Sequence, residues 1–304
     1  MAGQFASHPG VTSTAMTEAP IAIITVTYSP GEYLTKFLDS VPANSRVVMV
    51  DNGSTDGAPE AAAEAGKAEL LYSGGNIGYG AGMNLGARHL RAAREAGKIN
   101  PDYLVISNPD VVFSDGAIDE LLEAARRHPR AGSLGPRIVE ADGSAYPSAR
   151  AVPQLGSGIG HALLGKVWPT NPWTKRYLDD EDMESERTAG WLSGSCLLLR
   201  WDAFEALGGF DERYFMYMED VDLGDRLGRA GWLNVFVPSA EIRHAKGHAA
   251  GKHPDVVLKA HHDSAYRFQA DRLPGWRNLP VRLVLKAGLK IREKIAIAAA
   301  HGVG

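Results

Sequence analysis

The chain has 304 residues, of which 44% are hydrophobic and 22% charged, a balance typical of a globular protein with a full hydrophobic core. Its formal net charge of −4 argues against nucleic acid as a partner, because nucleic acid attracts cationic surfaces. A single cysteine, Cys196, excludes a disulfide framework and a cysteine-based metal cluster.

The sequence also bears on where the protein is found in the cell. It contains no run of about 18 apolar residues, so no helix is expected to span a membrane. Residues 1–19 are rich in Ser, Thr, Gly and Pro and lack the basic start and apolar core of a signal peptide. We therefore expect a disordered leader at residues 1–19 and a protein that stays in the cytosol.

Strand and helix candidates alternate through the first 130 residues. The strand candidates are continuously hydrophobic, which is typical of strands buried on both faces of a sheet. Strands are predicted at 21–28, 46–50, 68–72 and 103–107, and helices at about 32–40, 80–96 and 115–127, with an alanine-rich helix before the third strand. This order predicts an α/β fold with a mostly parallel central sheet flanked by helices.

The second half of the chain has a weaker pattern. Between residues 140 and 190, Trp168 and Trp173 either pack in the interior or line an acceptor cleft, and the acidic run 179–182 is expected to be a solvated loop. Further strands are predicted at 195–199, 233–237 and 242–244, and helices at 201–207, 221–230, 254–270 and along the C-terminal tail.

Polar residues follow three of the predicted strands: Thr27-Tyr28, Asp51-Asn52 and Asn108-Pro109-Asp110. In parallel sheets, ligands bind at the carboxyl ends of the strands, so these residues are candidates for one site. Taken singly, Asp51 could merely form a turn and cap a helix, and an Asn-Pro-Asp turn is common. Asp110 could instead ligate Mg²⁺ or Mn²⁺, which take oxygen ligands from carboxylates and from nucleotide diphosphates.

Three carboxylates, Glu219, Asp220 and Asp222, open a predicted helix directly after the apolar run 214–218. A helix start favours anions, so these residues could simply cap a surface helix. The apolar run would, however, carry them into a partly dry place, where a carboxylate becomes a stronger base. Like charges at Glu219 and Asp222 could raise the proton affinity of Asp220 further.

A glycine-rich segment and a histidine complete the candidate motifs. Residues 74–82 lack the G-x-G-x-x-G spacing of dinucleotide-binding folds and follow the third strand instead of the first, so a nicotinamide-dependent enzyme is not predicted. The glycines would still let a ligand approach the start of a helix closely. His244 ends a predicted strand; it is either structural or a second protein ligand to a metal-bound diphosphate.

The C-terminal tail is basic and amphipathic. From residue 274 to the end there are six basic residues and one acidic residue. Projected at 100° per residue, one sector of the tail holds Val281, Val284, Leu285, Leu289, Ile295 and Ala296, and the opposite side holds Arg282, Lys286, Lys290 and Lys294. Arg292 falls within the apolar sector and would have to extend its charged end to water. The helix could therefore pack on its own domain, or it could lie on anionic lipid head groups.

The order of these motifs resembles that of glycosyltransferase family 2, whose members have the GT-A fold. The matching segments span roughly residues 20–250 and are Thr27-Tyr28, 51–56, Asn76-x-Gly78-Tyr79-Gly80, Asn108-Pro109-Asp110, 208–216, Glu219-Asp220-x-Asp222-Leu223 and His244. Within the family, residues 146–150, 167–173 and 190–196 are most similar to rhamnosyltransferases that act on a lipid-diphosphate sugar.

This resemblance implies roles for individual residues. Asp220 takes the position of the catalytic base, and Asp110 and His244 would ligate the metal. Asn108 stands where the family motif has its first aspartate, so the nucleotide's own diphosphate would matter more to the metal. The donor nucleotide would be held by Thr27, Tyr28, Asp51, Asn76, Gly78, Asn108 and Asp110, and the acceptor sugar by Trp191, Gly194, Ser195 and Glu219.

The activity implied is metal-dependent, inverting transfer of L-rhamnose from dTDP-L-rhamnose to N-acetylglucosaminyl-diphospho-polyprenol, with Mg²⁺ or Mn²⁺ as cofactor. Such an acceptor implies peripheral association with the inner face of the plasma membrane, and a homo-oligomer is compatible with the sequence. The catalytic domain is expected at 20–253, with a donor half at 20–112 and an acceptor half at 113–253, followed by a helical extension at 254–304. Alternatives are a family 2 enzyme with another nucleotide sugar or a polysaccharide acceptor, and a non-catalytic sugar-binding module.

Overall fold

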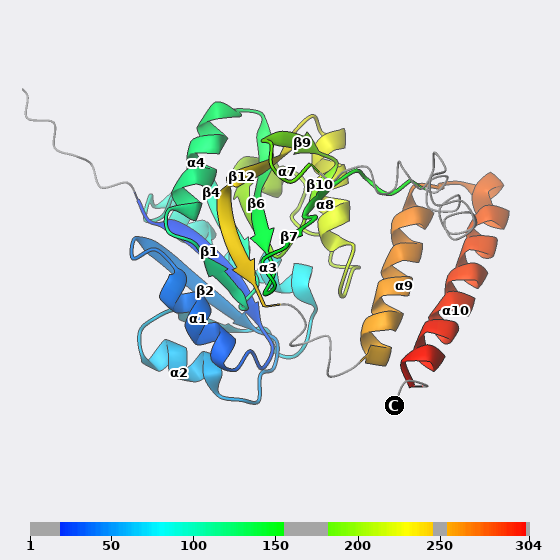
Figure 1. Ribbon diagram of the computed structural model, residues 1–304, viewed down its shortest axis with the longest axis horizontal. Coiled ribbons are helices and arrows are strands. Elements are labelled where there is room, and N and C mark those ends of the chain that lie inside the picture. The colour runs from blue at the N-terminus through cyan, green and yellow to red at the C-terminus, as the bar shows by residue number, and fades with distance from the viewer. Residues whose placement is uncertain (1–18, 155–181, 246–253, 302–304) are drawn as a thin grey trace, which may run out of the picture.

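The computed structural model of the protein describes residues 19–154, 182–245 and 254–301. A long sheet with helices on both faces forms the main body, and two antiparallel helices stand beside it at the C-terminal end (Figure 1). The predictions for residues 1–18, Trp168, Trp173 and residues 179–181 lie outside the described residues.

Four parallel strands in the order β3-β2-β1-β4 form one half of the sheet. They are β1 (Ile21–Thr27), β2 (Ser45–Asp51), β3 (Glu69–Tyr72) and β4 (Tyr103–Ser107), and the connecting helices are α1 (Glu32–Ser40), α2 (Ala58–Glu64) and α3 (Tyr79–Glu95). Every residue of β1 is buried, as its continuous hydrophobicity predicts. The predicted α/β architecture is confirmed, and its parallel strands bring the ends of β1, β2 and β4 to one edge.

The other half of the sheet continues from β4 through β11, β6, β12 and β5. The strand β11 (Cys196–Arg200) is antiparallel to β4 and to β6 (Ala131–Val139), whereas β12 (Leu233–His244) runs parallel to β6. At the edge, β5 (Val111–Phe113) pairs with β12 so that His244 lies opposite Val111. Short strands β7 (Ala145–Tyr146) and β9 (Arg187–Ala189) extend this half, and β8 (Ala149–Arg150) pairs separately with β10 (Trp191–Leu192).

Two hydrophobic clusters hold helices against the two faces of the sheet. On one face, Phe37 of α1 and Leu121 of α4 (Ala117–Arg127) pack in the same cluster as Val105 of β4. On the other face, Met83 of α3 and Leu223 of α8 (Glu219–Arg229) share a cluster with further strand residues, and α7 (Trp201–Ala206) belongs to it too. The core is therefore a helix–sheet–helix sandwich.

The structure corrects the predicted strand pattern of the second half. A single strand, β12, replaces the two strands predicted at 233–237 and 242–244, because the chain continues through a register shift between Val237 and Glu241. The strand β6 was not predicted, because glycines and a proline interrupt its apolar pattern. One of these glycines, Gly132, is needed for packing, because a Cβ there would lie only 2.7 Å from the Leu227 side chain of α8.

The C-terminal extension consists of α9 (Pro254–Asp271), a short 3-10 turn at Trp276–Asn278 and α10 (Leu279–His301). Phe268 of α9 is buried with Tyr214 and Val221 of the main body, which anchors the extension. The helix α10 packs along α9 (Figure 1), where Lys290 forms an ion pair with Asp263 at 3.3 Å. Among the described helices, none has both the length and the apolar character needed to cross a bilayer.

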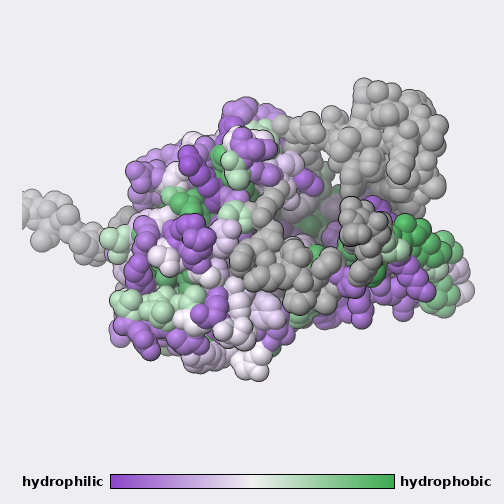
Figure 2. Space-filling view, turned by 60° about the horizontal axis from the view of Figure 1, so that its bottom comes forward, coloured by the Kyte–Doolittle hydropathy of each residue, from purple (hydrophilic) through white to green (hydrophobic). Residues whose placement is uncertain are grey.

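The apolar sector predicted for the tail is divided in the structure. Leu285 and Leu289 are half-buried, whereas Val284 is 74% and Ile295 65% exposed. Figure 2 shows the resulting apolar surface at the end of the molecule formed by α10, beside hydrophilic surface. The helix therefore packs on its own chain and also presents apolar side chains to solvent.

Candidate active site

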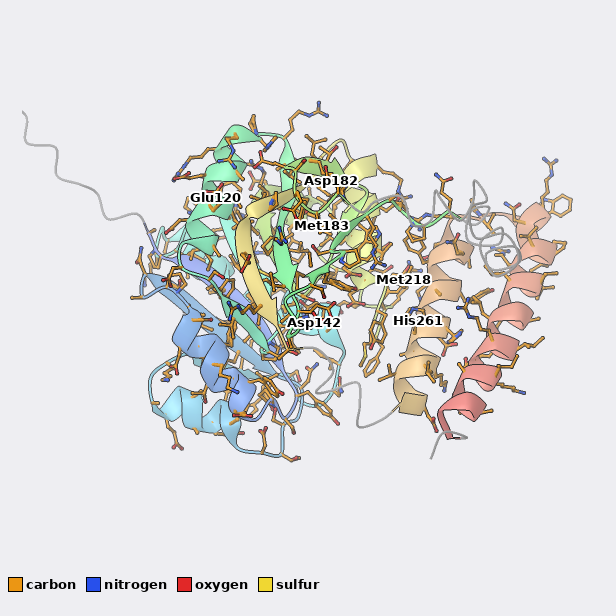
Figure 3. The ribbon with its side chains drawn as sticks, in the orientation of Figure 1. Glu120, Asp142, Asp182, Met183, Met218 and His261 are labelled. Carbon is orange, nitrogen blue, oxygen red and sulfur yellow. The ribbon has the colours of Figure 1, made fainter. Side chains whose placement is uncertain are left out.

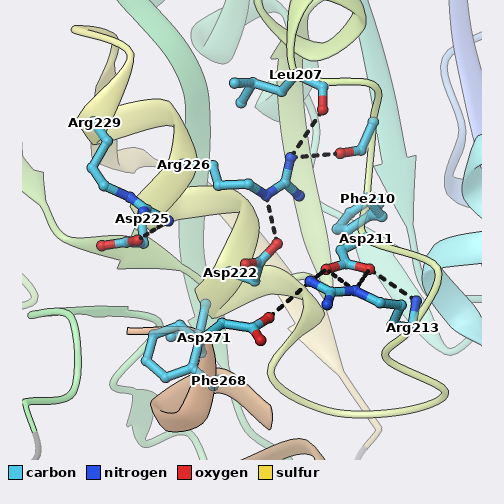
Figure 4. Close-up of polar contacts among 12 residues, drawn as sticks. Leu207, Phe210, Asp211, Arg213, Asp222, Asp225, Arg226, Arg229, Phe268 and Asp271 are labelled. Carbon is cyan, nitrogen blue, oxygen red and sulfur yellow. Dashed lines mark hydrogen bonds and ion pairs between the residues drawn. The ribbon is translucent and has the colours of Figure 1, made fainter. Parts of the chain in front are cut away.

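The first turn of α8 carries the three carboxylates singled out in the sequence. Tyr217 and Met218, directly before the helix, both have positive φ angles, 65° and 67°, which turn the chain sharply into it. Asp222 forms an ion pair at 2.6 Å with Arg226, whose guanidinium also donates to the carbonyls of Leu207 and Gly209 (Figure 4). Asp222 is thus a structural residue.

Asp220 is held by two backbone donors. Its Oδ2 accepts a hydrogen bond of 2.9 Å from the Gly194 N–H, and its Oδ1 accepts one of 2.8 Å from the Val221 N–H. Burial raises the pKa of the Asp220 carboxyl, although both hydrogen bonds oppose that rise. The result is a fixed carboxylate with increased basicity. Burial, and not a charge on Asp222, is the main cause.

Glu219 lies beside Asp220 and is 8% exposed. Burial raises the pKa of Glu219 to about 8, and the neighbouring charge of Asp220 adds to the rise. Its Oε2 is buried and has no hydrogen-bond partner in the described part of the chain. Two adjacent carboxyl groups with raised pKa values can retain a proton between them near neutral pH.

The strand and loop 191–195 lie against the start of α8. A Cβ on Gly194 would be 3.2 Å from the Asp220 Cβ, so glycine allows the close approach of these two segments. Trp191 is fixed by a 3.0 Å hydrogen bond from its indole N–H to the Ala151 carbonyl. The Ser193 and Ser195 hydroxyls are 3.1 Å apart. Of the four predicted acceptor residues, Gly194 and Glu219 thus lie directly beside Asp220.

Asp110 and His244 come together although 134 residues separate them, with His244 Nε2 3.0 Å from Asp110 Oδ1. The pairing of β5 with β12 causes this approach, because Asp110 precedes β5 and His244 ends β12. Asn108 joins them through its Nδ2, 3.4 Å from His244 Nε2. In the described part of the chain, no third His, Cys, Asp or Glu completes a metal-binding cluster, so the protein offers a pair of ligands at this place.

Tyr79 is hydrogen-bonded to the loop that holds Asp220. Its hydroxyl donates a hydrogen bond of 2.5 Å to the Gly194 carbonyl, the residue whose N–H holds Asp220. Burial raises the pKa of Tyr79 well above its usual value, and charges on Glu219, Asp220 and Asp110 add to the rise. Tyr79 was part of a noted motif, but the sequence alone did not identify it as a site residue.

A backbone hydrogen bond also joins the strand ends. The Asn108 N–H donates to the Ser195 carbonyl at 2.8 Å, where β4 ends beside the start of β11. Asn108, Ser195, Gly194 and Asp220 are thereby connected in a continuous chain of contacts.

The ends of β1 and β2 form a second rim of the site. The Asp51 carboxylate is 3% exposed and accepts hydrogen bonds from the Thr27 hydroxyl at 2.8 Å and from the Gly53 and Ser54 N–H groups. Its oxygens are thus largely used within the protein. Tyr28, by contrast, is 48% exposed at the end of β1.

The glycine-rich turn is fastened to this rim and to the loop before α8. Asn76 Oδ1 accepts a hydrogen bond from the Gly78 N–H at 3.1 Å, and Asn52 donates to the Gly78 carbonyl at 3.1 Å. The Tyr79 N–H donates to the Phe215 carbonyl at 3.2 Å. Gly78 has a φ angle of 90°, and a Cβ there would be 2.5 Å from the Phe215 carbonyl oxygen. Only glycine fits at this contact.

The chain matches known families and proteins. Residues 22–208 match the family described as Glycosyl transferase family 2, and residues 175–249 match Glycosyl transferase family group 2. A relative from Mycobacterium tuberculosis (strain ATCC 25618 / H37Rv), named N-acetylglucosaminyl-diphospho-decaprenol L-rhamnosyltransferase, is 51% identical, covering 91% of this chain and 92% of the relative. The rhamnosyltransferase WbbL of Escherichia coli (strain K12) is 25% identical over 82% of this chain and 92% of its own length.

A solved structure shows the same fold. It is the mannosyltransferase PcManGT from Pyrobaculum calidifontis in complex with GDP-Man and Mn²⁺, with a TM-score of 0.53, 15% sequence identity and coverage of 95% of this chain and 77% of the other. At that identity the likeness concerns the fold alone, and the fold is that of the GT-A glycosyltransferases.

Proposed function

Because this chain belongs to glycosyltransferase family 2, we propose that it transfers L-rhamnose from dTDP-L-rhamnose to N-acetylglucosaminyl-diphospho-polyprenol. The observation that carries the proposed chemistry is the buried Asp220 carboxylate, connected through Gly194, Ser195 and Asn108 to the place where Asp110 meets His244. The proposed sugar and acceptor are those in the name of the relative that is 51% identical. The division into a donor half at 20–112 and an acceptor half at 113–253 stays a prediction.

We place the donor nucleotide along the rim formed by the ends of β1 and β2. The exposed Tyr28 ring offers a surface on which a nucleobase can stack. Thr27 and Asp51 bond to each other, so we assign them to shaping the nucleoside pocket as well as bordering it. The turn at Asn76 and Gly78 closes this side and brings backbone close to the nucleotide.

Asp110 and His244 suit a divalent cation. One carboxylate oxygen and one imidazole nitrogen lie 3.0 Å apart, and their exposed fractions of 18% and 11% leave them accessible from the site. Oxygen and imidazole ligands suit Mn²⁺ and Mg²⁺, with Mn²⁺ the more tolerant of imidazole. When bound, such a cation neutralises the diphosphate leaving group. Asn108 adds a neutral amide beside the pair, which leaves the remaining ligand positions to the donor's diphosphate oxygens.

Asp220 would act as the general base. The Gly194 and Val221 N–H groups fix the carboxylate, and burial increases its affinity for the proton of the attacking hydroxyl. Trp191, Ser195 and Glu219 would border the acceptor sugar beside it. A single base acting on the acceptor hydroxyl suits one displacement, which inverts the anomeric centre. Retention by double displacement would instead require an enzyme nucleophile on the opposite face of the sugar.

We further propose that α10 rests peripherally on the anionic inner face of the plasma membrane, where a polyprenyl acceptor resides. Trp276 is 79% and Leu283 57% exposed, and the basic residues Arg277, Lys286 and Lys294 lie in the same segment. Exposed apolar side chains with interspersed cations are typical of helices that lie in a lipid interface. Removal of the residues after Gly275 should reduce sedimentation with anionic liposomes. Unchanged sedimentation, or dimerisation through this face seen by light scattering, would oppose this assignment.

A transfer assay tests the main proposal. Purified protein is incubated with Mn²⁺, radiolabelled dTDP-L-rhamnose and a short-chain N-acetylglucosaminyl-diphospho-polyprenol, and label in the lipid fraction is counted. GDP-mannose and UDP-glucose at equal concentration serve as matched donor controls. We expect label to move from dTDP-L-rhamnose alone. Transfer from another nucleotide sugar, but not from this one, would reject the assigned donor.

A further inference from the structure

We propose that a pocket between the loop at residues 213–215 and α9 binds the diphosphate of the lipid acceptor. This inference rests on the proposed function, because it assigns a place to the anionic group of that acceptor. The pocket has a volume of about 260 Å³ and is separate from the Asp110–His244 pair. It is lined by Arg213, Phe215, Lys259, Ala260, Asp263, Ser264 and Arg267.

The cations of the pocket are not equally available. Arg213 is engaged by Asp211 and by Asp271, at 2.6 and 2.8 Å (Figure 4). The only carboxylate of the lining, Asp263, pairs with Lys290 of α10. Lys259 and Arg267, by contrast, have no ion-pair or hydrogen-bond partner within the described ranges. Two uncompensated cations therefore border the pocket.

Lys259 and Arg267 lie on one side of α9. They are eight residues apart in the chain, with Asp263 midway between them, so they are separated by about two helical turns, or about 12 Å along the axis. The planar arginine fork can bind phosphate oxygens in a bidentate manner, and lysine can neutralise them as a point charge. A diphosphate, with several anionic oxygens, suits such a pair better than a singly charged ligand.

The pocket adjoins the loop that leads to the proposed base. Ser264 donates a hydrogen bond of 2.9 Å from its hydroxyl to the Met216 carbonyl, and the Tyr217 and His261 rings are 5.6 Å apart. Figure 3 labels Met218 and His261 in the region where this loop comes close to α9. Phe215, 38% exposed, thus belongs both to the pocket and to the segment immediately before Asp220.

This arrangement gives the C-terminal extension a role in orienting the acceptor. A diphosphate held by Lys259 and Arg267 would leave the attached sugar free to extend past the loop toward Asp220. The apolar Phe215 side chain would border the first part of the isoprenoid chain. Phosphate groups of anionic phospholipids share the same chemistry, so the test has to separate the two sources.

The experiment measures acceptor and donor kinetics in neutral detergent micelles that contain no phospholipid. We expect Lys259→Gln and Arg267→Gln each to raise the KM for the lipid-diphosphate acceptor about tenfold, equivalent to about 1.4 kcal/mol. The donor KM and kcat should stay within about twofold, because neither residue borders the nucleotide rim. Arg267→Lys should restore part of the acceptor affinity by keeping the charge.

A matched control is Lys98→Gln, which removes an exposed lysine with no partner in the described residues and far along the chain from the pocket. It should leave the acceptor KM unchanged. An unchanged acceptor KM in both pocket variants would overturn the proposal. So would reduced binding to phosphatidylglycerol vesicles with a normal acceptor KM, because the pocket would then serve lipid head groups.

A second readout separates this inference from the proposed function. If the unmodified protein transfers no rhamnose, the proposed function fails, but the pocket can still be tested by calorimetric titration with farnesyl diphosphate. About tenfold weaker binding in the Lys259→Gln and Arg267→Gln variants would support the pocket. Equal binding in all variants would refute it. Thermal unfolding of each variant checks that α9 remains folded.

Discussion

The substitution Asp220→Asn separates catalysis from folding. Asparagine has nearly the same shape as aspartate but cannot accept a proton at neutral pH. Its single amide oxygen can accept only one of the two hydrogen bonds that Gly194 and Val221 now donate. The loss of one such bond costs about 1 kcal/mol of folding free energy.

A second effect opposes that loss. Burial raises the pKa of Asp220, which means that the folded protein pays for keeping this carboxylate ionised. The neutral amide removes that cost, so the two effects largely cancel and the Tm should change by no more than ~3 °C. Loss of a general base, on the other hand, lowers kcat about 10²- to 10⁴-fold. The expected signature is a strong loss of activity with near-normal stability.

The assay is steady-state transfer together with thermal unfolding and donor binding by calorimetry. Asp222→Asn is the control, because Asp222 lies in the same helical turn but pairs with Arg226. Loss of the charged hydrogen bond to Arg226 costs about 1.5–3 kcal/mol of stability, and because burial also raises the pKa of Asp222, removal of its charge offsets part of that cost. The folded fraction of this variant should stay active. The reasoning would be refuted if Asp220→Asn bound the donor normally and retained more than about a tenth of the original kcat.

Three other predictions concern Glu219, the glycine turn and the metal. Burial raises the pKa of Glu219 from 4.5 to about 8, so the stability that its protonated form contributes is complete below about pH 4.5 and is lost as pH rises through about 8. Glu219→Gln should therefore flatten the fall in Tm over that pH range. An equally steep fall in the variant would contradict this prediction. Gly78→Ala should lower the free energy of unfolding by at least about 1–3 kcal/mol, because its Cβ would meet the Phe215 carbonyl. The control is Gly116→Ala, which is also at positive φ but has open space around it. Chemical denaturation should show a smaller loss of unfolding free energy for the control. EDTA should abolish transfer and added Mn²⁺ should restore it. His244→Ala should raise the Mn²⁺ concentration needed for half-maximal activity at least tenfold. Activity that persists in EDTA would argue against a metal.

Much of the parallel half of the fold could be predicted from the sequence. The strand β4 was predicted with its observed ends, because continuous apolar runs bounded by polar turns are a strong signal. Since parallel strands end at a common edge, it was also predictable that Asp51 and Asp110 would follow strands ending at the same edge of the sheet. The approach of Asp110 to His244 was expected from the resemblance and is seen at 3.0 Å.

Other features depend on contacts that no local pattern reveals. The Tyr79 hydroxyl reaches the Gly194 carbonyl 115 residues away, and neither residue shows this in its neighbourhood. Asp222 resembled Asp220 in the sequence, but its pairing with Arg226 gives it a structural role. In the tail, a helical projection identifies an apolar sector, yet only the position of α9 determines that Val284 faces solvent.

The central claim is that Asp220 activates the acceptor hydroxyl for direct attack on a donor whose diphosphate lies at Asp110 and His244. The stereochemistry of the product tests it most directly. Nuclear magnetic resonance of the rhamnosylated lipid should show an anomeric configuration opposite to that of the donor. A product with the donor's configuration would contradict the account, because retention requires a covalent intermediate or a different geometry of attack.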